Sequence, residues 1–285
     1  MIGDSRVNFG NGKYHIYSHV HSDSGHEGDA LFTVDDDDGL VTQIWEWGCS
    51  HMMSGLQGWN NLTKIMIHIC DSDASPGMGI FAEKTSQNTL YVHASNQHGL
   101  TAGELGGIVE NDQGWLLVFN SITPESTNTA NPAAAIQEIG VIDIGLNKKR
   151  KSVTFLKSSG KKRSSGCIAK YNEKFLLGYK EGSDFYLGTI DAKVTVKDQF
   201  EKVTGATIWG DRDDSFRLMR NGNIFWVGAP NNKGNTLIIS EFAIKEISED
   251  SINDGGDESE NNNGNKDGSV LYEITLIVGL ILLML

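Results

Sequence analysis

A short pattern of apolar and polar positions recurs along the chain: an apolar strand, a turn carrying Asn, Asp or Gly, and a second apolar strand. It covers residues 6–20, 106–120, 165–180 and 216–229. Turn residues placed between alternating apolar positions are the strongest local signal of a β-hairpin. The pattern therefore predicts four hairpins.

Each hairpin is followed by a further strand or strand pair, in residues 29–47, 136–156, 185–200 and 236–244, and a weaker unit covers 64–94. Five units of about 40–55 residues have the size of propeller blades, since each small sheet buries its faces only against its neighbours. We predict an all-β fold, a β-propeller of about five blades. A count of six blades and a two-sheet β-sandwich are the alternatives.

Composition agrees with one such module over residues 1–247. Hydrophobic residues make up 39% of the chain, with 33 glycines and 4 prolines, which provides a core and turns built on Gly, Asn and Asp. No stretch keeps a helical period, and no glycine-rich nucleotide-binding motif opens a helix.

The C-terminal part has a different character. Residues 248–269 are acidic and rich in Asn and Gly, which predicts a disordered stalk. The tail, 270–285, ends in twelve uncharged residues and is shorter than the roughly 20 residues of a spanning helix. We predict a GPI-attachment signal, with a tail anchor as the alternative; both place the protein at a membrane, at the cell surface. The candidate attachment residues are Asn263, Gly264 and Asn265.

The N-terminal segment does not fit this destination. Residues 1–17 contain no apolar stretch of the kind that a signal peptide needs. A GPI signal works only on a chain that enters the secretory path. We therefore favour the interpretation that the sequence begins inside a longer protein.

The charge of the chain argues against nucleic acid as a partner and suggests an anionic partner as an alternative. The net charge of −13 argues against a nucleic-acid binder, which needs a basic face. Residues 148–163 nevertheless hold eight bases and no acid. We interpret this run as a solvated hairpin tip, with a docking site for an anionic partner as the alternative.

Histidines and acids suggest a metal site. All eight histidines lie in the first 98 residues, and acids accompany them in two places: at 19–29, and where 47–51 is paired with 68–73. Neutral imidazole with carboxylate suits zinc, nickel or iron, although histidines on strands are often surface or core residues. The candidate metal set is His21, His26, Asp29, His51 and Asp71, with Glu27 as a general base.

A second candidate for a cation is the acidic run 35–38, before Gly39. It lacks the spacing of an EF-hand loop, so we interpret it as a solvated hairpin turn, with a loose calcium site as the alternative. The cofactor expected from the sequence is thus a divalent metal, calcium or zinc, or none.

A third cluster, residues 209–217, combines an aromatic ring with acids and arginines. Arg–carboxylate pairs are directional and could join one blade to the next. The same atoms could bind a sugar or a carboxylate, with Trp209 as a stacking platform, while Glu104 lies in a glycine-rich turn. The candidate ligand-binding residues are Trp209, Asp211, Arg212, Asp213, Arg217 and Glu104, beside Asp214. No motif of a hydrolase is present.

Three cysteines, Cys49, Cys70 and Cys167, lack metal-ligand spacing. Three buried thiols, or one disulfide and one free thiol in a secreted protein, remain the two alternatives. Asn61 begins an Asn-Leu-Thr sequon and is a glycosylation candidate if the chain is secreted.

Several motifs together resemble a family of uncharacterised, secreted, repeat-containing β proteins. They are GHEGDAL (25–31), WEWGCSH (45–51), AGELGG (102–107), GWLLVFN (114–120) and WGDRDDSFR (209–217). The resemblance implies an extracellular, propeller-like domain and no catalytic role for any residue. Members carry a second Cys where this chain has Ala74, so the resemblance implies no local partner for Cys70 and leaves a pairing with Cys49 open.

These observations lead to two functional hypotheses. The first is a membrane-anchored extracellular binding module whose loops, on one rim of the propeller, take a carbohydrate or a protein. The second is a metal-dependent enzyme that uses the His/Asp cluster of the first two repeats.

Overall fold

The computed structural model describes most of the repeat region and one later segment. The described residues are 2–21, 27–46, 52–61, 63–70, 79–83, 88–92, 103–123, 137–194, 200–208, 215–228, 236–246 and 272–282.

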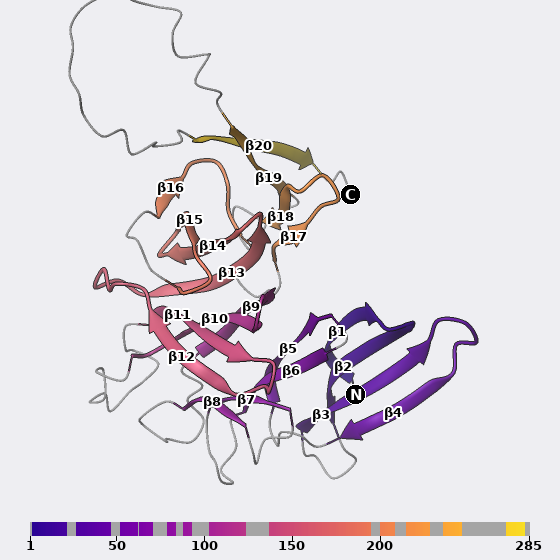
Figure 1. Ribbon diagram of the computed structural model, residues 1–285. Coiled ribbons are helices and arrows are strands. Elements are labelled where there is room, and N and C mark those ends of the chain that lie inside the picture. The colour runs from indigo at the N-terminus through magenta and orange to yellow at the C-terminus, as the bar shows by residue number, and fades with distance from the viewer. Residues whose placement is uncertain are drawn as a thin grey trace, which may run out of the picture.

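These residues form five four-stranded antiparallel sheets that follow one another around an arc (Figure 1). We call the sheets blades 1 to 5, in chain order. The prediction of an all-β, five-bladed propeller arrangement is confirmed.

The strands of each blade are consecutive in the chain. Blade 1 holds β1 (Ile2–Gly10), β2 (Lys13–His21), β3 (Glu27–Asp35) and β4 (Val41–Glu46); blade 2 holds β5 (Met52–Asn60), β6 (Thr63–Cys70), β7 (Gly79–Ala82) and β8 (Thr89–Val92). Blade 3 holds β9 (Gly103–Asn111), β10 (Gly114–Ser121), β11 (Glu138–Gly145) and β12 (Arg150–Phe155). Blade 4 holds β13 (Arg163–Tyr171), β14 (Lys174–Glu181), β15 (Asp184–Ile190) and β16 (Glu201–Val203); blade 5 holds β17 (Arg217–Leu218), β18 (Ile224–Gly228), β19 (Thr236–Glu246) and β20 (Tyr272–Leu282).

The first strands of the blades meet at the centre of the arc, because β9 contacts both β5 and β13, and β5 contacts β1. This arrangement gives the molecule two ends. We call the end at which the first strands begin the loop face, and the opposite end, where each first strand turns into the second, the turn face.

The four predicted hairpins are all present, as β1–β2, β9–β10, β13–β14 and β17–β18. In the first turn Asn11 and Gly12 both have positive φ, 55° and 71°, the combination that a two-residue turn needs to match the twist of its strands.

Two strand predictions were wrong in detail. The weak unit at 64–94 lacked its first strand, β5, whose glycines and Gln57 weaken the strand pattern. A Cβ on Gly58 would lie 2.9 Å from Ile108 Cδ1 and 3.0 Å from Trp115 Cδ1, so packing against blade 3 explains that glycine. The strand or strand pair predicted over 185–200 is also shorter than expected: β15 ends at Ile190, and the next described strand, β16, has three residues, Glu201–Val203.

Blades 2, 3 and 4 are apolar on both faces because each packs between two neighbours. We call the side toward the preceding blade the backward face and the other the forward face. On β10, Trp115, Leu117 and Phe119 pack with blade 2, while Leu116 and Val118 pack with blade 4. Four such clusters join the five blades in sequence.

Polar side chains fix the blades at the same joints. The Gln57 amide donates to Arg6 O (2.7 Å) and His15 O (2.9 Å) of blade 1. The Asn60 amide donates to Asn111 O (2.8 Å) and Gly114 O (2.7 Å) of blade 3. Blade 2 is therefore tied to both neighbours through backbone carbonyls near the turn face.

The fourth strand of blade 5 comes from beyond the predicted module of 1–247. β20 pairs with β19 along its whole length, from Thr236↔Leu282 to Glu246↔Tyr272. Its role as a membrane tail stays a prediction. Among the described residues no helix is long and apolar enough to cross a bilayer.

The cysteines follow one of the two alternatives. Cys70 is disulfide-bonded, and Cys167 is a buried free thiol. Cys49 lies outside the described residues. The chain thus combines a disulfide with a free thiol.

Candidate ligand face

The two ends of the propeller differ in the length of their connections. On the turn face, two residues join the first and second strands of blades 1 to 4, and the connections of five or more residues are 36–40, 83–88, 191–200, 219–223 and 247–271. On the loop face, connections of five or more residues are the rule, among them 47–51, 71–78, 93–102, 122–137 and 204–216. Binding residues gather on long connections held by a rigid scaffold, so the loop face is the candidate site.

The described residues of both predicted sets lie at strand ends on this face. Among the described residues, His21 ends β2, Asp29 lies near the start of β3, Glu104 near the start of β9, and Arg217 begins β17. The others belong to segments that join strand ends of the loop face and lie outside the described residues: His26, His51, Asp71, Trp209, Asp211, Arg212, Asp213 and Asp214, with Glu27 described in its backbone only.

Asp29 forms a buried cluster with Tyr17 and His68 at the joint between blades 1 and 2. The Tyr17 hydroxyl donates to Asp29 Oδ2 at 2.6 Å and lies 2.8 Å from His68 Nδ1. His68 Nδ1 is 3.5 Å from Asp29 Oδ2, and both side chains are fully buried. The sequence predicted Asp29 as a metal ligand but not its contact with Tyr17. That contact depends on the register between β2 and β3, which the sequence does not show.

Burial controls the protonation of this cluster. It lowers the pKa of His68 to about 3, so the imidazole is neutral at pH 7. Burial first, and the Asp29 charge second, raise the pKa of Tyr17 well above its usual range. His68 Nε2 is buried and has no hydrogen-bond partner among the described residues. In the described part of the chain, no three His, Cys, Asp or Glu side chains are grouped as a metal would need.

Glu104 joins the first strands of blades 3 and 4. Its carboxylate accepts a hydrogen bond from the Ser165 N–H at 3.3 Å. The two strands approach closely, because a Cβ on Gly106 would lie only 2.3 Å from Gly166 O. The prediction that Glu104 lies in a turn was wrong, because Gly103–Asn111 forms strand β9; Gly107 in this strand has a positive φ of 140°.

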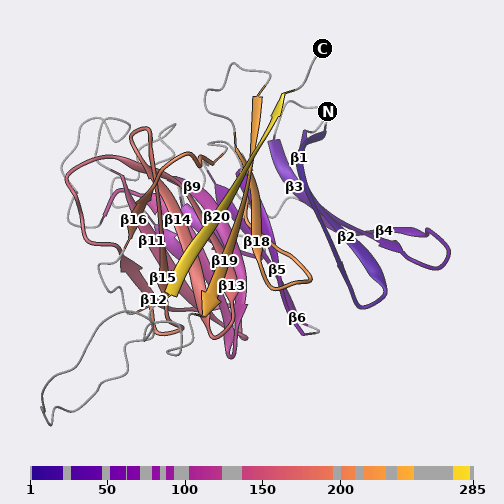
Figure 2. The same ribbon diagram turned by 90° about the horizontal axis from the view of Figure 1, so that it is seen from above.

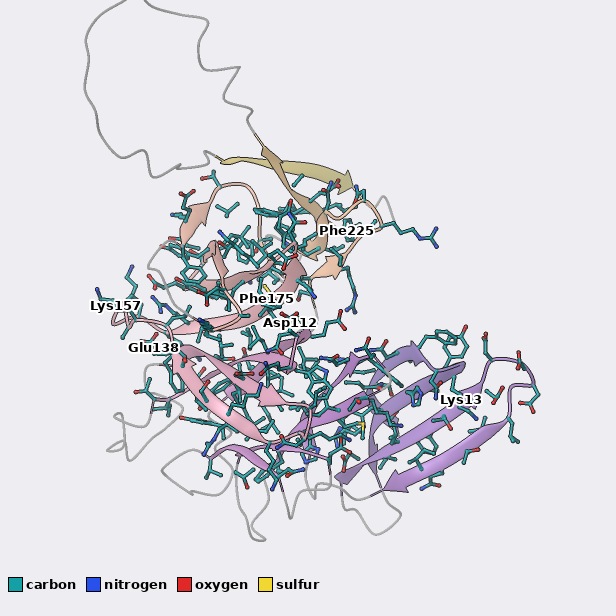
Figure 3. All side chains as sticks on the ribbon, viewed as in Figure 1. Lys13, Asp112, Glu138, Lys157, Phe175 and Phe225 are labelled. Atoms are coloured by element: carbon teal, nitrogen blue, oxygen red, sulfur yellow. The ribbon has the colours of Figure 1, made fainter. Side chains whose placement is uncertain are left out.

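A buried ion cluster at the joint of blades 3 and 4 was missed. Arg163 Nε donates to Glu181 Oε2 at 3.2 Å, and Arg163 NH1 forms an ion pair with Glu138 Oε2 at 3.3 Å. Arg163 also donates to Lys157 O at 2.8 Å and lies 4.9 Å from the centroid of the Tyr179 ring. Glu138 and Lys157 lie at the outer edge of these blades in Figure 3. The three charged side chains are each at most 8% exposed.

Serines complete this cluster. Ser159 Oγ donates to Glu181 at 2.5 Å and Ser158 Oγ donates to Glu138. The hydrogen bond from Ser159, and then that from Arg163, hold the pKa of Glu181 below its usual value. The only sequence signal was the end of the basic run at Arg163.

The basic run 148–163 is divided between the two ends of the molecule. Lys148 lies in the β11–β12 turn on the turn face and pairs with Glu83 at 2.9 Å. Lys157 and Lys161 lie in the β12–β13 connection on the loop face, where Lys161 is 3.5 Å from Glu181. Strand β12 separates the two groups, so the run is not one hairpin tip.

Two further predicted features lie on the turn face. The acidic run forms a hydrogen-bonded turn, in which Asp35 Oδ1 accepts from Asp37 N at 3.1 Å and Asp38 Oδ1 from Leu40 N at 2.8 Å. Lys13 pairs with Asp35 at 2.9 Å. The sequon residue Asn61 is exposed in the β5–β6 turn, away from the loop face.

Comparison with known proteins supports the fold and no family. No family model matches this chain, and no curated protein matches it. It is similar to the subtype N11 neuraminidase-like protein of A/flat-faced bat/Peru/033/2010 (H18N11), with TM-score 0.52 and 9% identity over 85% of this chain and 70% of that one.

Two other solved structures are similar over much of this chain. A thermostable family-43 glycoside hydrolase has TM-score 0.47 and 11% identity over 86% of this chain and 90% of that one. TolB from Acinetobacter baumannii has TM-score 0.46 and 16% identity over 80% of this chain, which spans 49% of TolB. The propeller implied by the resemblance to secreted repeat proteins is confirmed by the five sheets and by the likeness to the neuraminidase-like protein, while membership of that family stays a prediction.

Proposed function

We propose that the protein is a non-enzymatic binding module that takes a carbohydrate on its loop face. The observation that carries this proposal is the topology: two sets of residues predicted separately from the sequence belong to strand ends and connections of one face. The likeness to a neuraminidase-like propeller supports a carbohydrate as the proposed class of ligand.

The chemistry of the predicted ligand set suits a sugar. The ring of Trp209 offers an apolar surface for the face of a pyranose, as aromatic rings do for flat apolar groups. Arg212 and Arg217 donate to hydroxyl or carboxylate oxygens in a fixed geometry, and Asp211 and Asp213 accept from hydroxyls.

The proposed location is the cell surface. The disulfide at Cys70 supports an oxidising compartment, since disulfides persist in secreted proteins and are rare in the cytosol. The predicted tail would attach the protein to the membrane, by a GPI anchor at Asn263, Gly264 or Asn265 or by a tail anchor. With Asn61 on the turn face, a glycan there would leave the loop face free.

A glycan array probed with the purified protein tests the proposed function. We expect selective binding that Trp209→Ala and Arg212→Ala reduce at least about tenfold, the effect of losing roughly 1.4 kcal/mol of contact energy. Asp112→Ala, in the exposed β9–β10 turn of the turn face, is the matched control and should bind as the wild type. A silent array, or equal loss in the control, contradicts the proposal.

The second candidate function is a metal-dependent enzyme. It is favoured by the joint of blades 1 and 2, where strand ends carrying His21, Asp29 and His68 meet. Metal analysis of the purified protein separates the two functions. Stoichiometric zinc or calcium that is lost in His26→Ala and His51→Ala would favour the enzyme; a metal-free protein that binds glycans would exclude it.

A further inference from the structure

Blade 1 has an apolar backward face that no described blade covers. The side chains of Val7, Phe9, Tyr14 and Val41 are 63%, 51%, 42% and 62% exposed. Strand register places them in two rows with partly exposed neighbours: Val7 beside Ile16 and Phe32, and Phe9 beside Tyr14, Val34 and Val41. Single exposed apolar residues need no explanation, but a contiguous apolar face marks an interaction surface.

Blade 5 has the complementary surface at the other end of the arc. Its backward face buries Ile224 and Trp226 completely against blade 4. On its forward face, Phe225, Val227 and Ile239 are only partly buried. Figure 3 labels Phe225 on blade 5 and Lys13 on blade 1, at the two ends of the arc.

The exposed positions are those that form the joints elsewhere in the molecule. Tyr14 is the first backward-facing residue of its second strand, as are Trp115 in blade 3 and Phe175 in blade 4, which are 0% and 3% exposed. Phe225 corresponds in the same way to the forward-facing Leu116, which is fully buried. One unused half of a joint therefore lies at each end of the arc.

The described residues of blade 1 and blade 5 do not pack these two faces against each other. Strand contacts join every neighbouring pair of blades, and no comparable contact joins blade 5 to blade 1. Figure 1 shows blade 1 standing apart from blade 5, and in Figure 2 β2 and β4 of blade 1 extend away from the other blades.

We propose that the opening between blades 5 and 1 takes one further four-stranded antiparallel sheet, apolar on both faces. Its forward face packs on Val7, Phe9, Tyr14 and their neighbours, and its backward face packs on Phe225 and Val227. The occupant is thus a sheet of the kind that this chain repeats, and it continues the joint that the chain forms four times.

A second copy of the chain fits the opening less well. Suppose that blade 5 of the second copy packed on blade 1 of the first copy in the manner of the internal joints. Blade 4 of the second copy would then meet blade 5 of the first copy. A single sheet has no such trailing neighbour.

The first test uses the chain as it is, in sedimentation and with the dye ANS, which binds exposed apolar surface. The proposal predicts a monomer that binds ANS, with binding at least halved in Phe9→Ser. Absence of ANS binding would show that the faces are covered. A dimer that Phe9→Glu dissociates would make a second copy the occupant. Either result overturns the proposal.

The second test supplies a sheet. A chain in which residues 103–156, blade 3, are repeated ahead of Ile2 should unfold at a Tm at least about 5 °C higher, the scale of a gain of one to two kcal/mol, and should lose ANS binding. Phe9→Glu should lower the Tm of the extended chain and leave the original chain unchanged. The control is Leu40→Glu, at a residue that is 63% exposed and lies in a turn, which should be neutral in both chains. An unchanged Tm, or an equal effect of Phe9→Glu in both chains, overturns the proposal.

Discussion

At the scale of single residues, the joints between blades contain charged and polar groups whose partners come from distant segments. The sequence shows Arg163 only as the last base of a basic run. Its two carboxylates, Glu138 and Glu181, lie 25 residues before it and 18 after it in the chain. No local pattern encodes such a cluster, because it depends on which blades become neighbours.

Arg163→Met should lower the free energy of unfolding by about 3–5 kcal/mol, because it leaves two buried carboxylates without their cation. Urea unfolding at pH 7 measures this. Lys161→Met is the matched control: Lys161 also faces Glu181, but its side chain is 71% exposed, so the change should stay below about 1 kcal/mol. Equal losses in the two variants would show that the burial of Arg163 is unimportant.

His68 should make stability depend on pH. The unfolded histidine binds a proton near pH 6.5, whereas the folded one has a pKa of about 3. Between these values the unfolded state holds more protons, so the free energy of unfolding falls as the pH falls, by up to about 1.4 kcal/mol per pH unit. Above pH 6.5 His68 is neutral in both states, so it no longer makes the free energy of unfolding depend on pH.

Urea unfolding at pH 7, 6 and 5 tests this, with His68→Asn expected to flatten the dependence. His15→Asn is the comparison: burial and then the Lys64 charge lower the pKa of His15 as well. Because His15 is 6% exposed whereas His68 is fully buried, this change should flatten the dependence less. A wild type that is equally stable at pH 7 and pH 5 would contradict the account.

At the scale of elements, hairpins with Asn or Gly turns between alternating strands were predictable, as at residues 6–20. β5 was not, because Gly58 is required by the close approach of Trp115 rather than by the strand itself. β20 was not predicted as a strand either. Its uncharged residues satisfy the composition of a membrane tail and of a buried strand equally, and only pairing with β19 distinguishes them.

Removal of β20 should therefore affect blade 5. A chain that ends at Ser269 exposes the free edge of β19, and we expect faster hydrogen exchange of the amides in Thr236–Glu246, because they lose their cross-strand partners. The amides of β10, fully buried in blade 3, serve as the internal control. Unchanged exchange in β19 would indicate that the tail is independent of the blade.

At the scale of the whole molecule, the arc of five blades was predictable from the period and strand count of the repeat. The sequence predicted only that the ligand-binding loops lie on one rim of the propeller. Which residues share that rim depends on every first strand running in the same direction. Once that direction is known, Asp29 and Glu104 lie on the loop face. The segments with His26, His51, Asp71 and Trp209 lie outside the described residues, and the described strands on either side of them end on that face.

The central claim is that this loop face is the ligand surface. Hydrogen–deuterium exchange of the full chain, with and without the glycan that binds most strongly on the array, tests it most directly. The account predicts slower exchange in 22–27, 47–52, 93–103 and 204–217, and no change in the turns 11–12, 61–62, 112–113 and 172–173. Protection confined to those turns would contradict it.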